Sequence, residues 1–366
     1  MTVATTASKD REPLRRARRV VVKIGSRTLA GDGAIYLRLA TALAAAQKEG
    51  RAVVVVSSGA IALGTKRLGY RARPKEMARL QAAAAAGQTV LMRAYEEAFG
   101  SLGVTVAQVL LTHADLADRV RANNARAALS ALLDAGAIPV LNENDSVAVE
   151  EIKFGDNDQL SAMVTPLVDA DLLILLSDVA GLLDAAGDRV RVVRDVASEA
   201  TPLVRASSSA VGTGGMASKI EAARRATLAG ANVVVADARV EGVIQAILAG
   251  EDVGTLFVAA ARRLTAKKHW IAFTLRPRGD VVLDGGAAEA VRAKGKSVLP
   301  VGVLGVRGDF RAGDAVRLLD REGKEIGRGL ARYPAVEAVV VAGKAGKDLA
   351  REEHAVLVHR DELVVW

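Results

Sequence analysis

From residue 19 to about 258, short runs of β-branched residues alternate with longer stretches rich in alanine and leucine. The unbroken apolar runs indicate strands buried on both faces, and the stretches between them have helical length. This order predicts an α/β domain with an open, mainly parallel sheet and helices on both faces. The predicted strands are 20–24, 53–56, 104–111, 138–141, 172–176 and 233–235, the predicted helices are 34–48, 76–98, 121–135 and 217–229, and a weaker alternating stretch at 147–154 predicts a hairpin.

The pattern changes beyond about residue 258. A basic segment without acidic residues comes first, and a break of this kind is typical of a domain boundary. Strand-like pieces separated by glycine turns follow at 281–286, 301–306, 315–319 and 336–341, and they predict a small β-rich domain with one or two short helices. The predicted organisation is a basic N-terminal tail over 1–18, the α/β domain over 19–258, a linker over 259–273 and the small domain over 274–366.

Composition narrows the classes of protein. The 366 residues suit two domains, and 51% of them are apolar, which is enough to form cores. There is no cysteine, so disulfides, a cysteine nucleophile and thiolate metal sites are excluded. The four histidines are too scattered for a metal site, and no metal ligand is predicted. No apolar run reaches the length of a membrane helix or of a signal peptide, and we expect a cytoplasmic protein.

The net charge of +8 could indicate a polyanionic partner, but its distribution argues against one. Residues 1–23 hold seven basic and two acidic residues, whereas 274–366 hold 16 basic and 14 acidic residues. A nucleic-acid-binding domain usually gathers its cations on a folded face. Only 3% of the residues are aromatic, which disfavours base stacking. RNA binding is therefore a weak alternative.

Small and polar residues follow five of the predicted strands, at 25–26, 57–60, 112–115, 142–145 and 177–178. In open α/β sheets, ligands bind beyond the carboxyl ends of the strands. Turns and helix caps use the same residue types, so one such loop would mean little. Five loops together favour a ligand site.

Lys23 interrupts the apolar run 20–24 and is followed by Gly25. A lysine in a buried strand needs an anion or a carboxylate as partner, and a glycine lets backbone N–H groups approach a phosphate. A lysine on an edge strand that faces water is the alternative. The turn at 57–60 would likewise place N–H groups at a helix N-terminus, which suits an anion or a simple cap.

A second lysine, Lys219, follows a glycine-rich loop over 211–218 and opens a predicted helix. The loop composition suits phosphates, but its spacing matches neither a P-loop nor a dinucleotide-binding motif. A flexible loop is the alternative. Asp158, one turn into a predicted helix, could hold lysines or a metal-bound phosphate. The stretch 290–297 is similar to a loosened P-loop, but it ends a helix-like stretch, and we interpret it as a helix end.

Together these motifs resemble the amino acid kinase superfamily, and within it the glutamate 5-kinase family, whose members often carry a C-terminal PUA domain. The resemblance rests on the motifs at 23–26, 57–60, 142–145, 155–158 and 212–219, and in the small domain on 299–303 and 359–361. It implies an amino acid kinase fold followed by a PUA-like domain. The chain departs from the family pattern at two places. Ser177 stands in place of the usual threonine, which is a mild change, and the stretch 182–187 differs on the adenine side.

The resemblance implies a role for individual residues. Lys23 and Lys219 would be catalytic and contact the ATP phosphates, with Asp158 holding both lysines. The remaining residues implied to bind ATP are Gly25, Ser26, Ser177, Asp178, Thr213, Gly214, Gly215, Met216, Ala217 and Ser218. The residues implied to bind glutamate are Ser58, Gly59, Asp145 and Asn157, and Asp145 suits the ammonium group.

The implied activity is ATP-dependent phosphorylation of the γ-carboxylate of L-glutamate, the first step of proline biosynthesis, with ATP and Mg²⁺. Proline as feedback inhibitor, glutamyl phosphate reductase as functional partner and a homo-oligomer are implied as well. A kinase of another carboxylate, of carbamate or of a nucleotide on the same fold remains an alternative. So does an RNA-binding protein that acts through the PUA-like domain.

Overall fold

The computed structural model describes residues 9–31, 33–147, 157–206, 215–261, 263–345, 348 and 355–366. The chain forms two compact units, Met1–Arg263 and Leu264–Trp366, which we describe separately. Their boundary lies inside the segment expected to be a linker, and the second unit begins with the helical elements α13 (Ala266–His269) and η3 (Trp270–Thr274). The predicted hairpin at 147–154 falls, except for its first residue, outside the described residues.

An eight-stranded sheet forms the centre of the first unit, in the order β3-β4-β2-β1-β5-β7-β8-β6. Its strands are β1 (Arg19–Ile24), β2 (Ala52–Val56), β3 (Val106–Leu111), β4 (Ile138–Glu143), β5 (Leu172–Ser177), β6 (Val192–Val193), β7 (Asn232–Asp237) and β8 (Thr255–Phe257). All neighbouring strands are parallel except β7 and β8. The predicted open, mainly parallel sheet is confirmed.

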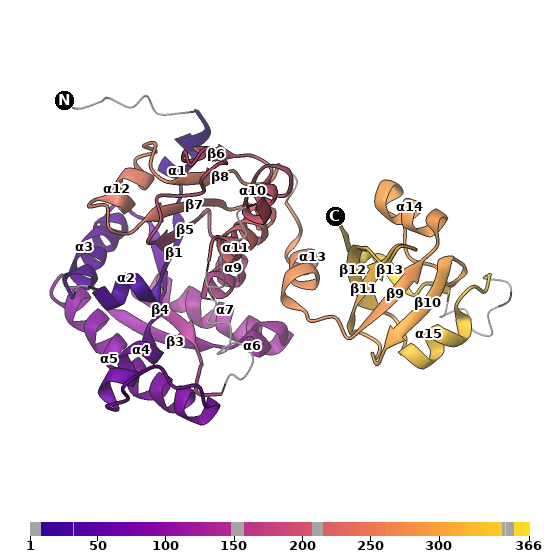
Figure 1. Ribbon diagram of the computed structural model, residues 1–366, viewed down its shortest axis with the longest axis horizontal. Helices are drawn as coiled ribbons and strands as arrows, with labels where there is room; N and C mark the ends of the chain where they lie inside the picture. The colour runs from indigo at the N-terminus through magenta and orange to yellow at the C-terminus, as the bar shows by residue number, and fades with distance from the viewer. Residues whose placement is uncertain are drawn as a thin grey trace. The chain divides into compact units, whose positions relative to one another are not determined.

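Helices cover both faces of this sheet (Figure 1). On one face lie α3 (Ala34–Lys48), α5 (Met77–Gly100) and α12 (Val243–Leu248), and on the other lie α7 (Arg119–Asp134), α9 (Asn157–Leu167) and α11 (Met216–Ala229). Strand β1 shows why its apolar run is unbroken, because Val20 and Val22 enter the first core whereas Val21 enters the second. The shorter helices are α2 (Ser26–Gly31), α4 (Ala60–Arg67), α6 (His113–Ala117), η2 (Val196–Ala200) and α10 (Thr201–Ala206).

The N-terminal segment differs from the basic tail predicted over 1–18. Residues 9–18 include η1 (Lys9–Arg11) and α1 (Glu12–Arg15), and they pack against the rest of the first unit. Arg11 is almost fully buried; its guanidinium donates to the carbonyl oxygens of Val253 at 2.8 Å and Gly254 at 3.0 Å. Asp252 lies 3.3 Å from the same guanidinium. Contacts with residues about 240 positions away explain why local sequence indicated only a charged tail.

The second unit is a five-stranded sheet in the order β10-β9-β11-β12-β13. Its elements are β9 (Gly279–Leu283), α14 (Gly285–Lys294), η4 (Pro300–Gly302), β10 (Val303–Gly308), β11 (Ala315–Leu319), β12 (Glu325–Ala331), α15 (Ala335–Val341) and β13 (Val358–Val365). The predicted small β-rich domain is confirmed. Helix α14 ends at Gly295, whose φ of +56° is left-handed. The stretch 290–297 is thus a helix end, as its order of elements indicated.

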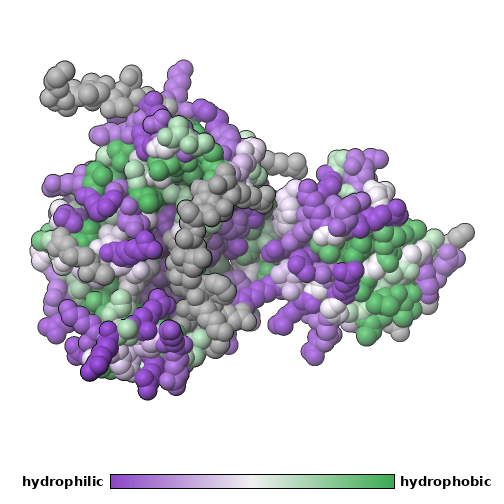
Figure 2. Space-filling model, in the orientation of Figure 1, coloured by the Kyte–Doolittle hydropathy of each residue, from purple (hydrophilic) through white to green (hydrophobic). Residues whose placement is uncertain are grey.

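One predicted strand of this unit is wrong. Residues 336–341 belong to helix α15, where Ala335, Ala338 and Val341 are buried at a spacing of three residues. Strand propensity of β-branched residues depends strongly on packing, and here packing of the helix on the sheet decides. The outward-facing Val336, Val339 and Val340 are exposed. Figure 2 shows hydrophobic surface on this unit in the region of α15.

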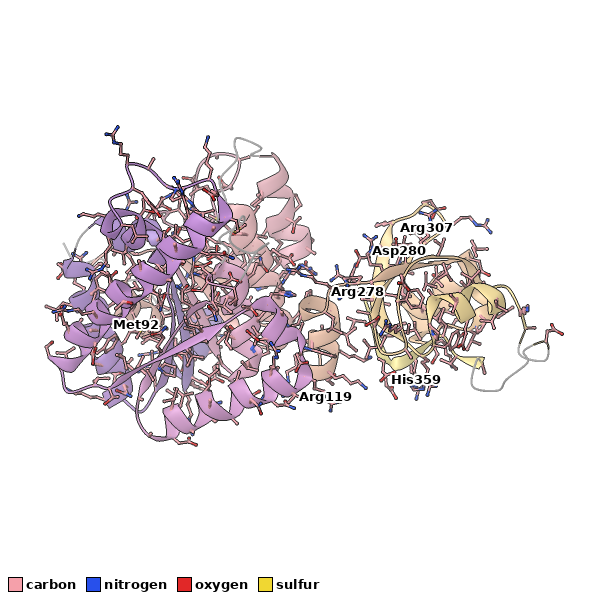
Figure 3. All side chains as sticks on the ribbon, turned by 90° about the horizontal axis from the view of Figure 1, so that it is seen from below. Met92, Arg119, Arg278, Asp280, Arg307 and His359 are labelled. Atoms are coloured by element: carbon pink, nitrogen blue, oxygen red, sulfur yellow. The ribbon has the colours of Figure 1, made fainter. Side chains whose placement is uncertain are left out.

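Acidic and basic side chains alternate on part of the second sheet. Asp280 on β9 is the cross-strand neighbour of Arg307 on β10 and of Arg317 on β11, and Figure 3 shows Arg278, Asp280 and Arg307. Arg317 donates to both carboxylate oxygens of Asp280, at 2.6 and 2.9 Å. Because an acid lies between the arginines, this row is not a continuous cationic face.

Helices α4 and α5 cross in backbone contact through two glycines. A Cβ atom added at Gly64 would lie 1.7 Å from the carbonyl oxygen of Ala83, and one added at Gly87 would lie 1.7 Å from that of Ala60. Neither position can hold a side chain unless the helices separate. Since α4 starts directly after the 57–59 loop, the crossing fixes α5 relative to that loop.

We expect Gly87→Ala to lower the free energy of unfolding by about 1–3 kcal/mol, because overpacking forces the backbones apart. Urea denaturation followed by circular dichroism measures this change. Gly100→Ala at the end of the same helix is the control, since nothing lies within 4 Å of a Cβ added there. The control should leave stability unchanged or raise it by up to about 1 kcal/mol. Equal effects at both positions would contradict the backbone contact.

Candidate active site

Three buried side chains from separate elements meet beyond the carboxyl ends of the central strands. The Nζ atom of Lys23, on β1, lies 2.6 Å from Oδ1 of Asp158, and Nζ of Lys219 lies 3.1 Å from Oδ2. Asp158 is in the first turn of α9 and Lys219 in the first turn of α11. Their exposed fractions are 0% for Asp158, 7% for Lys23 and 5% for Lys219. Lys23 is thus buried and paired, and does not face water.

The two ammonium groups keep Asp158 ionised. Burial alone would raise the pKa of this carboxyl. The charges of Lys23 and Lys219, with the hydrogen bonds from Lys23 and Ser218, outweigh burial and hold the pKa below its ordinary value. The hydroxyl of Ser218 also donates to Oδ2, at 2.7 Å. Two ammonium groups share one carboxylate, which leaves an excess of positive charge among these three side chains. Such a cluster suits a phosphoryl group.

Gly25 borders the Lys23 ammonium. A Cβ atom added at Gly25 would lie 3.9 Å from Nζ of Lys23, so the missing side chain leaves space beside this group. The backbone N–H of Gly25 donates to the carbonyl oxygen of Leu176 at 3.3 Å and extends the pairing of β1 with β5. This N–H group is therefore already used within the sheet, and the space beside the Lys23 ammonium is the feature that a glycine provides here.

Ser177 ends β5 and Asp178 follows it, on the side where the resemblance implies the nucleotide. The hydroxyl of Ser177 donates to Oδ1 of Asp178 at 3.2 Å, and the guanidinium of Arg27, on α2, pairs with Oδ2 at 2.9 Å. The hydrogen bond from Arg27 is the main reason why the pKa of Asp178 is lowered. These contacts join α2, which begins at Ser26, to the end of β5.

The glycine-rich loop is only partly described. Thr213 and Gly214 fall outside the described residues, whereas Gly215 is the N-cap of α11, and Met216, Ala217 and Ser218 form its first turn. The structure therefore brings the end of this loop to Asp158 through Ser218 and Lys219.

A second polar cluster lies on the other side of Asn157, the residue before Asp158. The Nδ2 atom of Asn157 is within hydrogen-bond distance of three acceptors: the carbonyl oxygen of Ser57 at 2.7 Å, Oγ of Ser58 at 2.9 Å and Oδ1 of Asn142 at 2.9 Å. Gly59 adopts a left-handed φ of +98° as it leads into α4. The structure thus brings together Ser58 and Asn157, which come from distant parts of the sequence.

Asp145 lies in the turn that follows β4 and is half-buried. Asn142, near the end of β4 itself, is in direct contact with Asn157. The end of β4 and the loop after β2 therefore meet at one edge of the sheet, as parallel neighbours do.

Sequence reasoning did not assign a role to Asn142 or to Gln88. The amide of Asn142 donates to Oε1 of Gln88, on α5, at 2.9 Å, and both residues are buried. A usable signal existed, because each is a polar residue in an otherwise apolar setting: Asn142 at the end of a buried strand, Gln88 after five consecutive alanines and a glycine. Only the fold shows that the two side chains meet.

Among the described residues, no group of three or more His, Asp or Glu side chains is placed to hold a metal ion. Mg²⁺ commonly binds through substrate phosphates and water with only one or two carboxylates. In the same part of the chain, no helix has the length and apolar character needed to cross a membrane.

Comparison with known sequences defines the class of protein. Residues 18–237 match the Amino acid kinase family, and residues 279–352 match the PUA domain. The chain belongs to the amino acid kinase family. Within it, glutamate 5-kinases are similar over nearly the whole chain. The protein of that name from Geobacter metallireducens is 47% identical, with 96% of this chain and 98% of the relative covered. That from Myxococcus xanthus is also 47% identical, with 99% and 100% covered.

A solved structure supports the fold alone. The crystal structure of N-acetylglutamate synthase from Neisseria gonorrhoeae, complexed with coenzyme A and L-arginine, matches with a TM-score of 0.50 and 17% identity. The match covers 77% of this chain and 68% of that chain.

We expect Asp158→Asn to lower the free energy of unfolding by about 3–5 kcal/mol at pH 7, because two buried ammonium groups lose their counter-ion. The pKa of Asp158 in the folded state lies below its ordinary value of 3.8. The stabilisation by the carboxylate is therefore complete above that ordinary value and is lost only as the pH falls through the lower, folded value. Urea denaturation of both proteins between pH 8 and pH 3 measures the difference.

The control is Asp169→Asn, which removes an exposed ion pair with Arg126 of 3.5 Å. Exposed pairs of this kind contribute at most about 1 kcal/mol. A loss for Asp158→Asn no larger than that of the control would contradict a buried, charged cluster.

Proposed function

We propose that the protein transfers the γ-phosphoryl group of ATP to the γ-carboxylate of L-glutamate and forms γ-glutamyl phosphate, the first step of proline biosynthesis. The observation that supports this proposal most directly is the pair of buried lysines on Asp158 at the carboxyl edge of the sheet. The glutamate 5-kinases that match nearly the full chain point to the same reaction.

The reaction needs no general base. A γ-carboxylate is ionised at neutral pH, so one of its oxygens attacks the γ-phosphorus directly. The new bond joins this oxygen to phosphorus, the bond to the β–γ bridging oxygen breaks, and ADP leaves with that electron pair. This agrees with an active site whose described side chains are lysines, amides, hydroxyls and carboxylates. Catalysis then consists of positioning and of charge stabilisation.

Lys23 and Lys219 would bind the phosphate oxygens and neutralise charge on the phosphoryl group during transfer. Asp158 would act through them by holding both ammonium groups in fixed positions in a buried site. The open space at Gly25 and the first turn of α11 would receive the phosphates, with Ser177 and Asp178 towards the nucleoside. Mg²⁺ would enter with ATP and supply charge neutralisation for its phosphates.

The substrate amino acid would lie on the side of Asn157, next to Ser58, Gly59 and Asp145. A carboxylate at Asp145 suits the substrate ammonium by charge. Asn157 and Asp158 are consecutive residues, so one helical turn would contact acceptor and phosphoryl donor together. This adjacency supports the proposed division of the site into two sides.

We also propose which enzyme consumes the product, which metabolite inhibits the reaction and in what form the protein acts. The product is an acyl phosphate that water hydrolyses readily, which favours glutamyl phosphate reductase as the consumer. Proline carries the same α-ammonium and α-carboxylate pair as glutamate, which suits it as a feedback inhibitor. A cytoplasmic homo-oligomer that uses MgATP completes the proposal.

The decisive assay is trapping of the acyl phosphate as a hydroxamate with wild-type protein, L-glutamate and MgATP. We expect hydroxamate to form with glutamate and not with aspartate or N-acetylglutamate. Phosphorylated carbamate and UMP do not yield a hydroxamate, so ADP release is measured with these two acceptors, and we expect none above background. Preference for another acceptor would overturn the assignment of glutamate while leaving the fold assignment in place.

In the same assay, we expect Lys23→Ala and Lys219→Ala each to lower kcat about 10²–10³-fold, as does the loss of one preorganised charge-stabilising group. Lys66→Ala, which changes an exposed lysine on α4, is the matched control and should retain wild-type kcat. Near-normal turnover of both lysine variants would contradict the role proposed for Lys23 and Lys219.

We expect Asp145→Ala to raise KM for glutamate about 10–100-fold, because a charged hydrogen-bond partner of the ammonium is lost. KM for ATP should stay within about twofold. Initial-rate kinetics with each substrate varied separately measures both constants. A rise in KM for ATP alone would reverse the proposed acceptor and nucleotide sides.

A further inference from the structure

Two buried hydroxyl groups tie the 57–59 loop, which follows β2, to helix α5. Oγ of Ser57 lies 2.9 Å from the hydroxyl oxygen of Tyr95, and both residues are fully buried. The same Oγ donates to the carbonyl oxygen of Ser58 at 3.4 Å, which is a long hydrogen bond. The hydroxyl groups of Tyr95 and Ser57 therefore connect α5 to the peptide unit that joins Ser58 to Gly59.

The direction of both hydrogen bonds follows from the carbonyl group. A carbonyl oxygen only accepts, so the single hydroxyl proton of Ser57 is used in the bond to Ser58. Tyr95 must then donate its own proton to Oγ of Ser57. Burial raises the pKa of the Tyr95 hydroxyl, which keeps this proton in place at neutral pH. Without the Tyr95 hydroxyl, the buried oxygen of Ser57 would lose its donor.

The ring of Tyr95 is held by its aromatic neighbours. The ring of Tyr36, on α3, meets it edge-on, with 5.1 Å between the ring centroids and 81° between the planes. The ring of Phe99 stacks on it at 6.3 Å and 30°. The hydroxyl of Tyr36 is also buried, but it has no hydrogen-bond partner among the described residues. The two tyrosines therefore share one aromatic cluster, and only Tyr95 uses its hydroxyl to contact the loop.

Two orientations are open to the peptide unit between Ser58 and Gly59. Gly59 has a φ of +98° and a ψ of −2°. These angles are close to the values of about +80° and 0° at the third residue of a type II turn. Rotation of this one peptide unit would give a type I turn, with a φ of about −90° at the same residue. Glycine adopts positive and negative φ about equally readily, so Gly59 by itself does not select either orientation.

The backbone hydrogen bonds of the loop do not distinguish the two orientations. The N–H of Ser57 donates to the carbonyl oxygen of Leu141 at 2.8 Å, and the carbonyl oxygen of Ser57 accepts from Asn157 at 2.7 Å. The carbonyl oxygen of Gly59 accepts from an N–H group of α4 at 3.0 Å. These three groups belong to the peptide units before and after the one between Ser58 and Gly59. In the described part of the chain, the hydroxyl of Ser57 is the hydrogen-bond partner of that unit's carbonyl.

The selected orientation decides what the loop presents to a ligand. The C=O and N–H groups of one peptide unit point in opposite directions. Because the carbonyl of Ser58 faces the buried hydroxyl of Ser57, the N–H of Gly59 points away from that hydroxyl. A peptide unit in the other orientation would present the carbonyl oxygen of Ser58 in place of this N–H group, and that oxygen would repel a carboxylate.

We propose that Tyr95 is a positioning residue for the acceptor amino acid. Its hydroxyl holds the hydroxyl of Ser57, which holds the carbonyl of Ser58, so that the N–H of Gly59 donates to a carboxylate of the acceptor. The inference rests on the proposed function, in which Ser58 and Gly59 bind glutamate. The two lysines are held by Asp158, so Tyr95 acts on acceptor binding and not on phosphoryl transfer.

The test is initial-rate kinetics of Tyr95→Phe, which removes the hydroxyl and keeps the ring. We expect KM for glutamate to rise about three- to tenfold, the change that loss of one hydrogen bond produces in an equilibrium. The physical reason is that molecules with the peptide unit in the other orientation do not bind glutamate well. The values of kcat and of KM for ATP should stay within about twofold of wild type.

The matched control is Tyr36→Phe, which removes a hydroxyl from the neighbouring ring of the same cluster. Because this hydroxyl has no hydrogen-bond partner among the described residues, KM for glutamate should stay within about twofold of wild type. Thermal denaturation of both variants confirms that the compared proteins are folded.

A double-mutant cycle tests the connection through Ser57. Ser57→Ala removes the hydroxyl between Tyr95 and Ser58, and it should raise KM for glutamate by about the same factor as Tyr95→Phe. In the Ser57→Ala background, the Tyr95 hydroxyl has nothing left to hold. Tyr95→Phe should then change KM for glutamate by less than about twofold.

The outcomes distinguish the inference from the function on which it rests. Wild-type protein that does not phosphorylate glutamate overturns both. An active wild type with an unchanged KM for glutamate in Tyr95→Phe overturns the inference alone, as does an equal rise in KM for ATP. Equal effects of Tyr95→Phe and Tyr36→Phe also overturn it, because packing of the aromatic cluster would then be the cause. Additive effects of Ser57→Ala and Tyr95→Phe would show that the two hydroxyl groups act separately, and they overturn it too.

Discussion

The carboxylate of Asp158 holds together the three buried side chains of the candidate active site. A buried carboxylate with two buried ammonium groups is stable only if all three remain together, because any one left alone in a dry environment is costly. The cluster therefore requires β1 and the first turns of α9 and α11 to meet at one place. The stability of this region and the charge stabilisation that we propose for phosphoryl transfer thus rest on the same three side chains.

Asn157 and Asp158 connect this cluster to a second polar network. The first turn of α9 presents an amide to the loops after β2 and β4, and a carboxylate to the two lysines. Helix packing supports this second network, since the glycine crossing of α4 and α5 fixes Gln88 relative to the 57–59 loop. Every described residue of both networks belongs to the first unit.

Predictions from sequence succeeded where a local pattern reflects local burial. Runs such as 172–176 are apolar on both faces because both faces are covered, and β5 lies there. They failed where distant contacts decide. Residues 336–341 have strand propensity yet form α15, because the helix buries Ala338 against its sheet. Arg11 belongs to a segment that resembled a charged tail, but carbonyl groups near residue 253 bury it.

The amino-acid sequence by itself determined the class of fold, the loops that carry polar residues and the two lysines beside glycine turns, because burial and backbone freedom leave local patterns. The resemblance to a family added the roles. Only the tertiary structure decided that Lys23 and Lys219 share one carboxylate, that the N–H of Gly25 is already used within the sheet, and that Gln88 reaches Asn157 through Asn142. Hydrogen bonds and ion pairs are set by positions to within a few tenths of an ångström, and spacing along the chain does not encode such distances between separate elements.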